Sequence, residues 1–485
     1  MRRRFGFGTA LALVAALSAC GGGGGGSSAP TPTPSAGLPS PSPSPTPSPS
    51  ATCSLRARQD WAAAQLREWY LFPETLPASF DPSPFTTVEA YIDSLTATAR
   101  SQRRDRFFTY LTSIREENAF FASGSSAGFG IRLSTDTNAR RLFVAEAFEG
   151  APALAAGIDR GTEILAIGTS ASNLRTVDSI IAAEGSAGIT NALGPSTAGT
   201  TRVLQISDAS GTRTVTVTKA EFDLTPVSSR YGARIIEDNG RRVGYVNLRT
   251  FISSADPALR NAFASFRSQG ITEVIVDFRY NGGGLVSIAN LMGDLLGGNR
   301  SASEAFSHTT FRPEKSSNNS TRNFQPQPQS IASTKIAFIG TGGSASASEL
   351  VINSFIPYLR QNAALIGSNT FGKPVGQIAL DREACDDRLR VVAFRTENAA
   401  RQGDYFDGLA TKVEAFCRAG DDITRPLGDP LEASTRQALD YLAGRSCSAT
   451  GSGGITGQSV REPVSRELLT PAAPTPAQRE VPGAF

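Results

Sequence analysis

Residues 335–359 read KIAFIGTGGSASASELVINSFIPYL, and this stretch decides the fold of the second half of the chain. Lys335 to Ile339 is a short apolar run that is typical of a buried strand, and Ser346 to Leu359 has the apolar spacing of a helix. Small residues join the two, so a substrate chain could approach closely. A serine at a helix start lies beside free main-chain N–H groups and the positive end of the helix dipole. Serines also commonly cap helices, which is the alternative role for Ser346.

The same alternation of strands and helices extends over residues 222–447. Further buried strands are expected at Val243–Leu248, Glu273–Phe278 and Ala364–Gly367. Further helices are expected at Pro257–Gln269 and Val286–Leu296. This alternating order predicts an α/β layer structure.

Two regions of different character precede residue 222. Residues 53–124 are predicted to form a small helical domain, because aromatic and aliphatic residues recur at helical spacing. They are Trp61, Leu66, Trp69, Tyr70, Tyr91, Ile92 and Leu95, with Phe107, Phe108, Tyr110 and Leu111 as a further apolar face. Residues 125–221 instead contain short alternating strands, expected at Leu142–Ala147, Val203–Ser207 and Thr214–Thr218. The fold class is therefore expected to be multidomain, with α+β and α/β parts.

Both ends of the sequence have the composition of unfolded or processed segments. Residues 1–20 have a basic start, a short apolar run and the ending Leu-Ser-Ala-Cys, which predicts an export signal with a lipidated Cys20. Residues 21–52 are nearly all Gly, Pro, Ser, Thr and Ala, which is typical of a spacer. Residues 448–485 are expected to be a disordered tail. The predicted location is the cell envelope, with the lipid in the outer membrane and the protein facing the periplasm.

Four cysteines follow Cys20, namely Cys53, Cys385, Cys417 and Cys447. An even number in an exported chain indicates two disulfides, and the sequence allows three pairings. The favoured pairing joins Cys385 to Cys417 and Cys53 to Cys447.

The composition excludes several kinds of catalytic site. The chain has 485 residues, 40% of them hydrophobic, with a net charge of +3 and a single histidine, His308. A Ser-His-Asp triad, a Cys-His pair and a multi-histidine metal site are therefore disfavoured. The chain also has no basic run with interleaved aromatic residues, so no nucleic-acid partner is expected. Only five lysines occur, and one of them, Lys373, lies in a glycine-containing segment.

Two more segments carry chemistry in the second half of the chain. Residues 277–284 (DFRYNGGG) follow a predicted strand, and their glycines could present bare N–H groups to an anion or simply form a tight turn. Residues 370–377 (TFGKPVGQ) contain Lys373 beside apolar residues. Burial in an apolar pocket would lower the pKa of this lysine and allow it to act as a base, whereas in open solvent it would be a surface lysine.

Residues 150–167 (GAPALAAGIDRGTEILAI) in the strand-rich region predict a short helix followed by a turn and a strand. This order resembles the core signature of PDZ domains. Upstream, Gly128, Phe129, Gly130 and Ile131 resemble the loop with which PDZ domains bind a peptide carboxylate. These glycines could otherwise form turns in a generic β-rich domain.

Together the segments at 277–284, 342–349 and 370–377 resemble the carboxy-terminal processing peptidases, also called tail-specific proteases. The resemblance implies a helical N-terminal cap, a PDZ-like domain and a peptidase core of the crotonase/Clp-like ββα type. It also implies that Ser346 is the nucleophile, that Lys373 is the general base and that Gln377 orients the lysine. The oxyanion hole would be formed by the main-chain N–H groups of Gly283 and Ala347.

The function expected from this resemblance is that of a serine endopeptidase with a Ser-Lys pair, which needs no metal and no organic cofactor. Its partners would be exported proteins or peptides recognised by their C-terminal or unstructured tails, and a membrane reached through Cys20. The alternative is a catalytically silent PDZ-containing binding or scaffold lipoprotein. A Ser/Lys hydrolase of the penicillin-binding type is disfavoured, because the chain contains no Ser-x-x-Lys. The natural substrate, the cleavage preference and the oligomeric state do not follow from the sequence.

Overall fold

A computed structural model describes residues 51–445 and 466–485. The central element is a six-stranded sheet in the order β10-β11-β12-β15-β16-β19, parallel except for the β10–β11 pair. Its strands are β10 (Ala233–Asp238), β11 (Arg241–Asn247), β12 (Glu273–Asp277), β15 (Lys335–Gly340), β16 (Ala363–Gly367) and β19 (Ala415–Arg418). A parallel sheet must be covered on both faces, which explains its continuous apolar runs.

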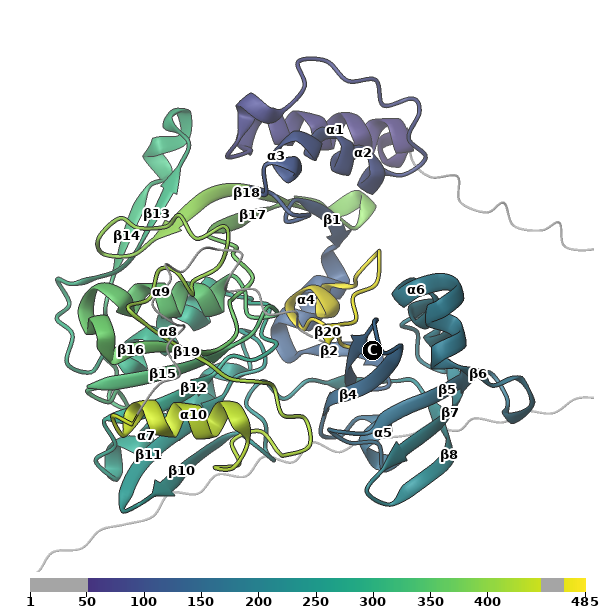
Figure 1. Cartoon of the computed structure of the whole chain (residues 1–485). Coiled ribbons are helices and arrows are strands. Elements are labelled where there is room, and N and C mark those ends of the chain that lie inside the picture. Colours follow the sequence, from purple (N-terminus) through teal and green to yellow (C-terminus); the bar gives the residue numbers. More distant parts are fainter. Residues whose placement is uncertain (1–50, 446–465) are drawn as a thin grey trace, which may run out of the picture. The chain divides into compact units, whose positions relative to one another are not determined.

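Helices cover the two faces of this sheet (Figure 1). On one face, α7 (Ala255–Ser268), α8 (Val286–Leu296) and α9 (Ala347–Leu359) share an apolar core with β12 and β15. On the other face, α10 (Ala433–Leu442) packs on a second core. The strands and helices expected for this region are confirmed, with boundaries within about two residues.

The carboxyl ends of β12 and β15 position the candidate site. The two strands are parallel neighbours, and Asp277 pairs with Ile339 near their ends. Both chains therefore leave the sheet at the same edge, which brings residues 277–284 beside residues 342–349.

A five-stranded antiparallel sheet was not foreseen from the sequence. It contains β1 (Tyr110–Ser113), β13 (Ala305–Phe311), β14 (Ser320–Asn323), β17 (Val375–Arg382) and β18 (Asp387–Glu397). The helices α1 (Leu55–Trp69), α2 (Val88–Leu95) and α3 (Ala97–Ser101) pack on it through a shared apolar cluster. The expectation that Tyr110 and Leu111 lie on a helix is wrong, because β1 pairs with β18 at these residues.

Residues 125–218 form most of a seven-stranded sheet. Its strands are β3 (Ile131–Asp136), β4 (Arg141–Ala147), β5 (Glu163–Gly168), β6 (Arg175–Thr176), β7 (Thr201–Asp208), β8 (Gly211–Thr218) and β20 (Glu467–Leu468). The helices α5 (Pro152–Ala155) and α6 (Val177–Leu193) contribute to its core. A separate pair, β2 (Ser125–Gly128) and β9 (Ala220–Asp223), follows α4 (Ile114–Ser123). The three strands predicted for this region are confirmed.

The prediction of a disordered tail is wrong for residues 466–485. This stretch contains β20 and α11 (Pro476–Glu480), and Leu469, Val481 and Phe485 are buried. Its order depends on pairing with β3, a distant strand whose free edge the local composition does not reveal. Residues 448–465 lie outside the described residues.

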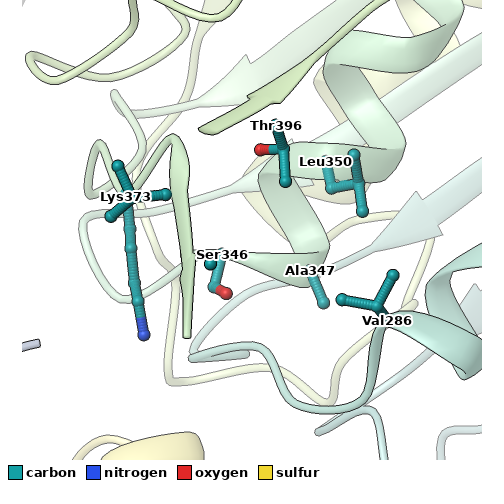
Figure 2. Close-up of a pocket in the computed structure, with 8 residues that line it drawn as sticks. Val286, Ser346, Ala347, Leu350, Lys373 and Thr396 are labelled. Atoms are coloured by element: carbon teal, nitrogen blue, oxygen red, sulfur yellow. The ribbon is translucent and has the colours of Figure 1, made fainter. Parts of the chain in front are cut away.

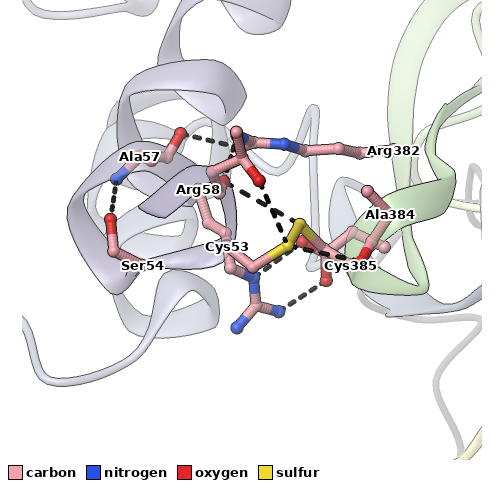
Figure 3. The surroundings of a disulfide bond; sticks show 9 residues. Cys53, Ser54, Ala57, Arg58, Arg382, Ala384 and Cys385 are labelled. Carbon is pink, nitrogen blue, oxygen red and sulfur yellow. Dashed lines mark hydrogen bonds and ion pairs between the residues drawn. A yellow bond between two sulfur atoms is a disulfide. The ribbon is translucent and has the colours of Figure 1, made fainter. Parts of the chain in front are cut away.

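The favoured disulfide pairing is also wrong. Cys53 is bonded to Cys385 (Figure 3), and not to Cys447. The bond joins the start of α1 to the turn between β17 and β18. Arg58 Nη2 lies 2.5 Å from Asp387 Oδ1 at the same junction, and Arg382 Nη1 donates to Ala57 O at 2.8 Å. These contacts bring together ends that are 332 residues apart in sequence.

Cys417 is disulfide-bonded as well, but it is not paired with Cys385. Cys447 lies outside the described residues, as do Cys20, the predicted export signal and most of the predicted spacer. Within residues 51–445 and 466–485, no helix has the length and apolar character needed to span a membrane.

Candidate active site

Loops that follow three strands of the six-stranded sheet lie together beside one pocket. Ser346 follows β15, Lys373 follows β16, and the glycines at 282–284 follow β12. Figure 2 shows the side chains of Ser346 and Lys373 on the wall of this pocket. The pocket is lined by Val286, Ser346, Ala347, Leu350, Lys373, Val375, Gly376 and Thr396. The lining is therefore mostly apolar, with the hydroxyls of Ser346 and Thr396 and the amine of Lys373 as its polar groups.

Ser346 has a strained main chain. It immediately precedes α9, with φ 53° and ψ −112°, a region that residues with a side chain rarely adopt. Such conformations persist only where the surroundings enforce them, and they cluster at functional sites. The Ser346 side chain lies on the wall of the pocket (Figure 2).

The two serines on either side of Ser346 have structural roles. Ser344 Oγ donates to Phe278 O at 2.7 Å, and Ser348 Oγ donates to Asn281 O at 3.1 Å. Both bonds fasten the serine-containing loop to residues 277–284. The alternation of serine and alanine thus separates two fastening hydroxyls from the one that lines the pocket.

Gly283 lies directly against Ser346. A Cβ atom at Gly283 would come within 2.7 Å of Ser346 Cβ, and its φ of 122° favours glycine. Its N–H, however, donates to Asn281 Oδ1 at 2.9 Å, so this predicted oxyanion donor is engaged. The other predicted donor, the N–H of Ala347, has no acceptor among the described residues.

Glu349 ties the serine and lysine segments together, a role that the sequence reading missed. Its buried carboxylate accepts from the N–H groups of Ser346 (3.1 Å), Gly372 (2.7 Å) and Lys373 (2.8 Å). Burial raises the pKa of Glu349, while these hydrogen bonds act in the opposite direction. A glutamate three residues into a helix often bonds back to the residue before the helix, and this was the available signal.

Lys373 and Gln377 are joined by a hydrogen bond. Lys373 Nζ donates to Gln377 Oε1 at 2.9 Å, and Gln377 Nε2 donates to Phe108 O. The Phe108 ring lies 5.0 Å from Lys373 Nζ. Loss of surrounding water lowers the pKa of Lys373 from 10.5, which favours the neutral amine that a base requires.

Phe108 reaches the site from the N-terminal region because Asp105 fixes its main chain. Asp105 Oδ1 accepts from the N–H of Phe108 at 2.7 Å, and Asp105 Oδ2 accepts from the hydroxyl of Tyr70 at 2.8 Å. Asp105 is fully buried. The sequence reading identified neither residue as part of the site, since nothing local connects them to Lys373.

The serine and the lysine are not hydrogen-bonded to each other. Among the described residues, no hydrogen bond joins Lys373 Nζ to Ser346 Oγ, although both line the pocket. The Lys373 amine is instead bonded to Gln377 Oε1.

The other predicted residues lie elsewhere. Gly128 to Ile131 lead into β3, where the N–H groups of Gly130 (2.9 Å) and Ile131 (3.3 Å) both donate to the main-chain oxygen of Phe485. His308 is buried on β13, with Nδ1 2.8 Å from Thr321 Oγ1, and does not line the pocket. No group of three or more His, Cys, Asp or Glu in the described part of the chain is placed to hold a metal ion.

Comparison with known proteins finds similarity in sequence and in fold. Residues 242–400 match peptidase family S41. A carboxyl-terminal-processing protease of Picosynechococcus is 28% identical over 258 residues, which cover 52% of this chain and 55% of the relative. The chloroplastic carboxyl-terminal-processing peptidase 3 of Arabidopsis thaliana is 29% identical over 335 residues, which cover 67% of this chain and 61% of the relative. The chain thus spans between about half and three fifths of these relatives' length.

The fold is shared with a solved structure. A protein of Bacteroides fragilis that is assigned to the S41 proteases superposes with a TM-score of 0.60 at 23% identity, covering 79% of this chain and 97% of that one. The matched residues 242–400 include Gly283, Ser346, Lys373 and Gln377. Residues 242–400 are thus similar to peptidase family S41, and the carboxyl-terminal processing proteases are among the proteins that this chain resembles.

Proposed function

We propose that this protein is a serine endopeptidase in which Ser346 is the nucleophile and Lys373 is the general base. The observation that carries the proposal is the placement of the strained Ser346 and the partly desolvated Lys373 on the wall of one pocket, with Gly283 directly against Ser346. Glu349 supports it, since its three hydrogen bonds fix both reacting segments relative to each other.

In the proposed reaction, neutral Lys373 accepts the proton of Ser346 Oγ while that oxygen attacks the carbonyl carbon of a peptide bond. The tetrahedral intermediate collapses as the C–N bond breaks, and the lysine gives its proton to the leaving amine. An acyl-enzyme ester remains. A water molecule, deprotonated by Lys373, then attacks this ester and releases the carboxylic acid and Ser346.

The oxyanion of each intermediate would be held by main-chain N–H groups. Ala347 at the start of α9 offers one, and the end of a helix dipole adds to its effect. Gly283 would offer the other once its N–H leaves Asn281. Loss of one such donor typically costs about 3–4 kcal/mol of transition-state stabilisation.

We further propose that the seven-stranded sheet is a PDZ-like module that delivers protein substrates by their C-terminal or unstructured tails. The edge of β3 and the N–H groups of Gly130 and Ile131 support this role, since they can pair with an extended chain and hold its final oxygen. Export, lipidation at Cys20 and an outer-membrane location facing the periplasm complete the proposal, on the composition of residues 1–52.

Substitution of the two catalytic residues tests the function. Purified Ser346→Ala and Lys373→Ala are expected to lose cleavage of an unfolded protein such as casein, by at least about a thousandfold, while remaining folded. Ser210→Ala and Lys412→Ala change an exposed serine and an exposed lysine, and they should retain the activity of the unmodified chain. Full activity of Ser346→Ala would refute the assignment. Absence of cleavage by the unmodified chain, together with peptide binding, would instead support the silent binding protein.

A further inference from the structure

The C-terminal segment, residues 466–485, adds to the free edge of β3 as an antiparallel strand in two parts. Glu467 and Leu468 pair with Thr135 and Ser134, and Ala484 then pairs with Arg132. The register continues across the two parts, so residues 470–482 form an insertion within one added strand. Strand addition at a sheet edge is how PDZ-like modules bind extended peptides.

The second part of this strand occupies the loop predicted to bind a peptide end. Phe485 donates its N–H to Ile131 O at 2.9 Å and accepts from Gly130 N–H at 2.9 Å. A Cβ atom at Gly128 would come within 2.8 Å of the Phe485 carbonyl carbon, so the loop encloses the main chain of this residue closely. The Phe485 side chain is 5% exposed and belongs to the same apolar core as Phe129.

The C-terminal segment also reaches two loops of the candidate site, residues 277–284 and residues 342–349. The Glu480 main-chain oxygen accepts from the N–H of Gly282 at 3.0 Å, beside the predicted oxyanion donor. A Cβ atom at Gly343, in the serine-containing loop, would come within 2.7 Å of Leu468 Cδ1. The C-terminal segment therefore touches both the loop that contains Gly283 and the loop that contains Ser346.

Arg132 connects the C-terminal segment to residues 277–284, the glycine loop. Its buried Nη1 donates to Pro482 O at 2.5 Å and to Tyr280 O at 3.0 Å. Tyr280 has a φ of 62°, so the glycine loop is strained at the residue that receives this bond. The docked segment and the conformation of residues 277–284 are thus joined through one guanidinium group.

The Glu480 side chain is buried near the proposed general base. It forms no hydrogen bond and no ion pair within 4.0 Å among the described residues, yet its carboxylate interacts electrostatically with Lys373. A buried carboxylate without a hydrogen bond destabilises the arrangement that buries it.

We propose that residues 466–485 are an intramolecular ligand, which fills the peptide groove along β3, covers the catalytic loops and keeps the peptidase inactive until a competing chain displaces it. The inactivating part of this inference depends on the proposed peptidase function, whereas the occupied groove does not. In this form the Glu480 main-chain oxygen engages the N–H of Gly282, and the N–H of Gly283 donates to Asn281 Oδ1.

The segment also defines the chain that can replace it. A competitor must be extended, with free main-chain groups to pair with β3. It must place a large apolar side chain where Phe485 lies, because that position is enclosed by the apolar core. The substrates we infer are therefore unfolded protein ends whose last ordered residue is aromatic or aliphatic.

Peptide binding tests the inference without any proteolysis. A fluorescein-labelled peptide with the sequence of residues 475–485 (TPAQREVPGAF) is titrated into full-length Ser346→Ala, followed by fluorescence anisotropy. Adding Phe485→Ala should tighten peptide binding by at least roughly tenfold, because the groove is then free for a larger fraction of the time. Leu431→Ala truncates an apolar side chain that is 63% exposed, and should leave the affinity unchanged. Equal affinity in all three proteins, or no binding by any of them, would contradict the inference.

Hydrogen exchange gives a second measurement that needs no change in the segment. In Ser346→Ala, excess unlabelled peptide should speed exchange within residues 466–485 while residues 128–135 stay protected. Unchanged exchange in 466–485 under saturating peptide would overturn the inference. In the Ser346-containing chain, Phe485→Ala should raise kcat/KM for an unfolded substrate several-fold, with Leu431→Ala as control. Displacement without any proteolysis would refute the peptidase and leave the occupied groove standing.

Discussion

Two regions of the molecule each bury a carboxylate beside Lys373, and they do so in opposite ways. In the core, Glu349 accepts hydrogen bonds from three main-chain N–H groups and ties the serine and lysine segments together. In the C-terminal segment, Glu480 is also buried but has no hydrogen-bond donor among the described residues. The first carboxylate is a permanent part of the site, whereas the second is held there only by the rest of its segment.

The contrast shows how the serine and lysine segments can be held firmly while residues 466–485 cover them only reversibly. Hydrogen bonds to a buried charge stabilise it, so Glu349 holds the segments that carry Ser346 and Lys373 together. A buried charge without them lowers the stability of the docked segment, which rests on pairing with β3 and on the apolar anchors Leu469, Val481 and Phe485. A buried glutamate thus stabilises the site in one region, at Glu349, and favours release of the C-terminal segment in the other, at Glu480.

Removal of the core carboxylate should have the largest effect. Glu349→Ala leaves three buried N–H groups without an acceptor, each at about 1–3 kcal/mol, so we expect a loss of at least about 3 kcal/mol in the free energy of unfolding. Activity should fall below detection, because Ser346 and Lys373 lose their common anchor. Urea unfolding and casein cleavage measure the two effects, and Glu89→Ala, at an exposed glutamate, is the control. Near-normal stability of Glu349→Ala would contradict the stabilising role that distinguishes Glu349 from Glu480.

A side chain at Gly283 should have a smaller and purely local effect. In Gly283→Ala the added methyl group meets Ser346 Cβ, and the φ of 122° becomes strained. The expected result is a fall in kcat of roughly 10²–10³, the range for a lost oxyanion donor. Binding of the 475–485 peptide should stay the same, since the groove along β3 is not touched. A variant that cuts casein normally would exclude Gly283 from the oxyanion hole.

Much of the core could be predicted because its strands are buried on both faces. Runs such as residues 335–340 (KIAFIG) and 363–367 (AALIG) stand out by composition alone. The antiparallel sheet that includes β17 and β18 was missed, because its strands mix charged and apolar residues; β18 reads DRLRVVAFRTE. Gln377, which lies on β17, was nevertheless named as a candidate site residue, from a motif and not from periodicity.

The contacts that the sequence could not give are those between distant segments. Phe108 and Asp105 join the site through folding of the N-terminal region onto β17 and β18, and no local pattern marks them. The C-terminal segment reads TPAAPTPAQREVPGAF over residues 470–485, a composition typical of disorder. It is ordered only because β3 offers an unpaired edge and the core offers an apolar site for Phe485. The Cys53–Cys385 bond likewise follows from tertiary proximity.

The smallest expected effect is on the pH dependence of kcat/KM, and it tests the action of Glu480 on Lys373 directly. Only neutral Lys373 can act as the base, so kcat/KM should rise with pH through the lysine's pKa. Burial lowers this pKa, Glu480 and Asp105 raise it, and Arg479 and Arg390 lower it. Glu480→Gln removes the larger of the two raising charges, so the rising limb of the kcat/KM profile should move to lower pH.

Full release of the segment should move this limb less than Glu480→Gln does. Phe485→Ala withdraws Glu480 and Arg479 together, and their charges act on the pKa of Lys373 in opposite directions. Glu89→Gln should leave the profile where it is. A limb that moves to higher pH in Glu480→Gln would mean that this carboxylate does not act on Lys373. The two regions would then be linked through β3 and the glycine loop alone.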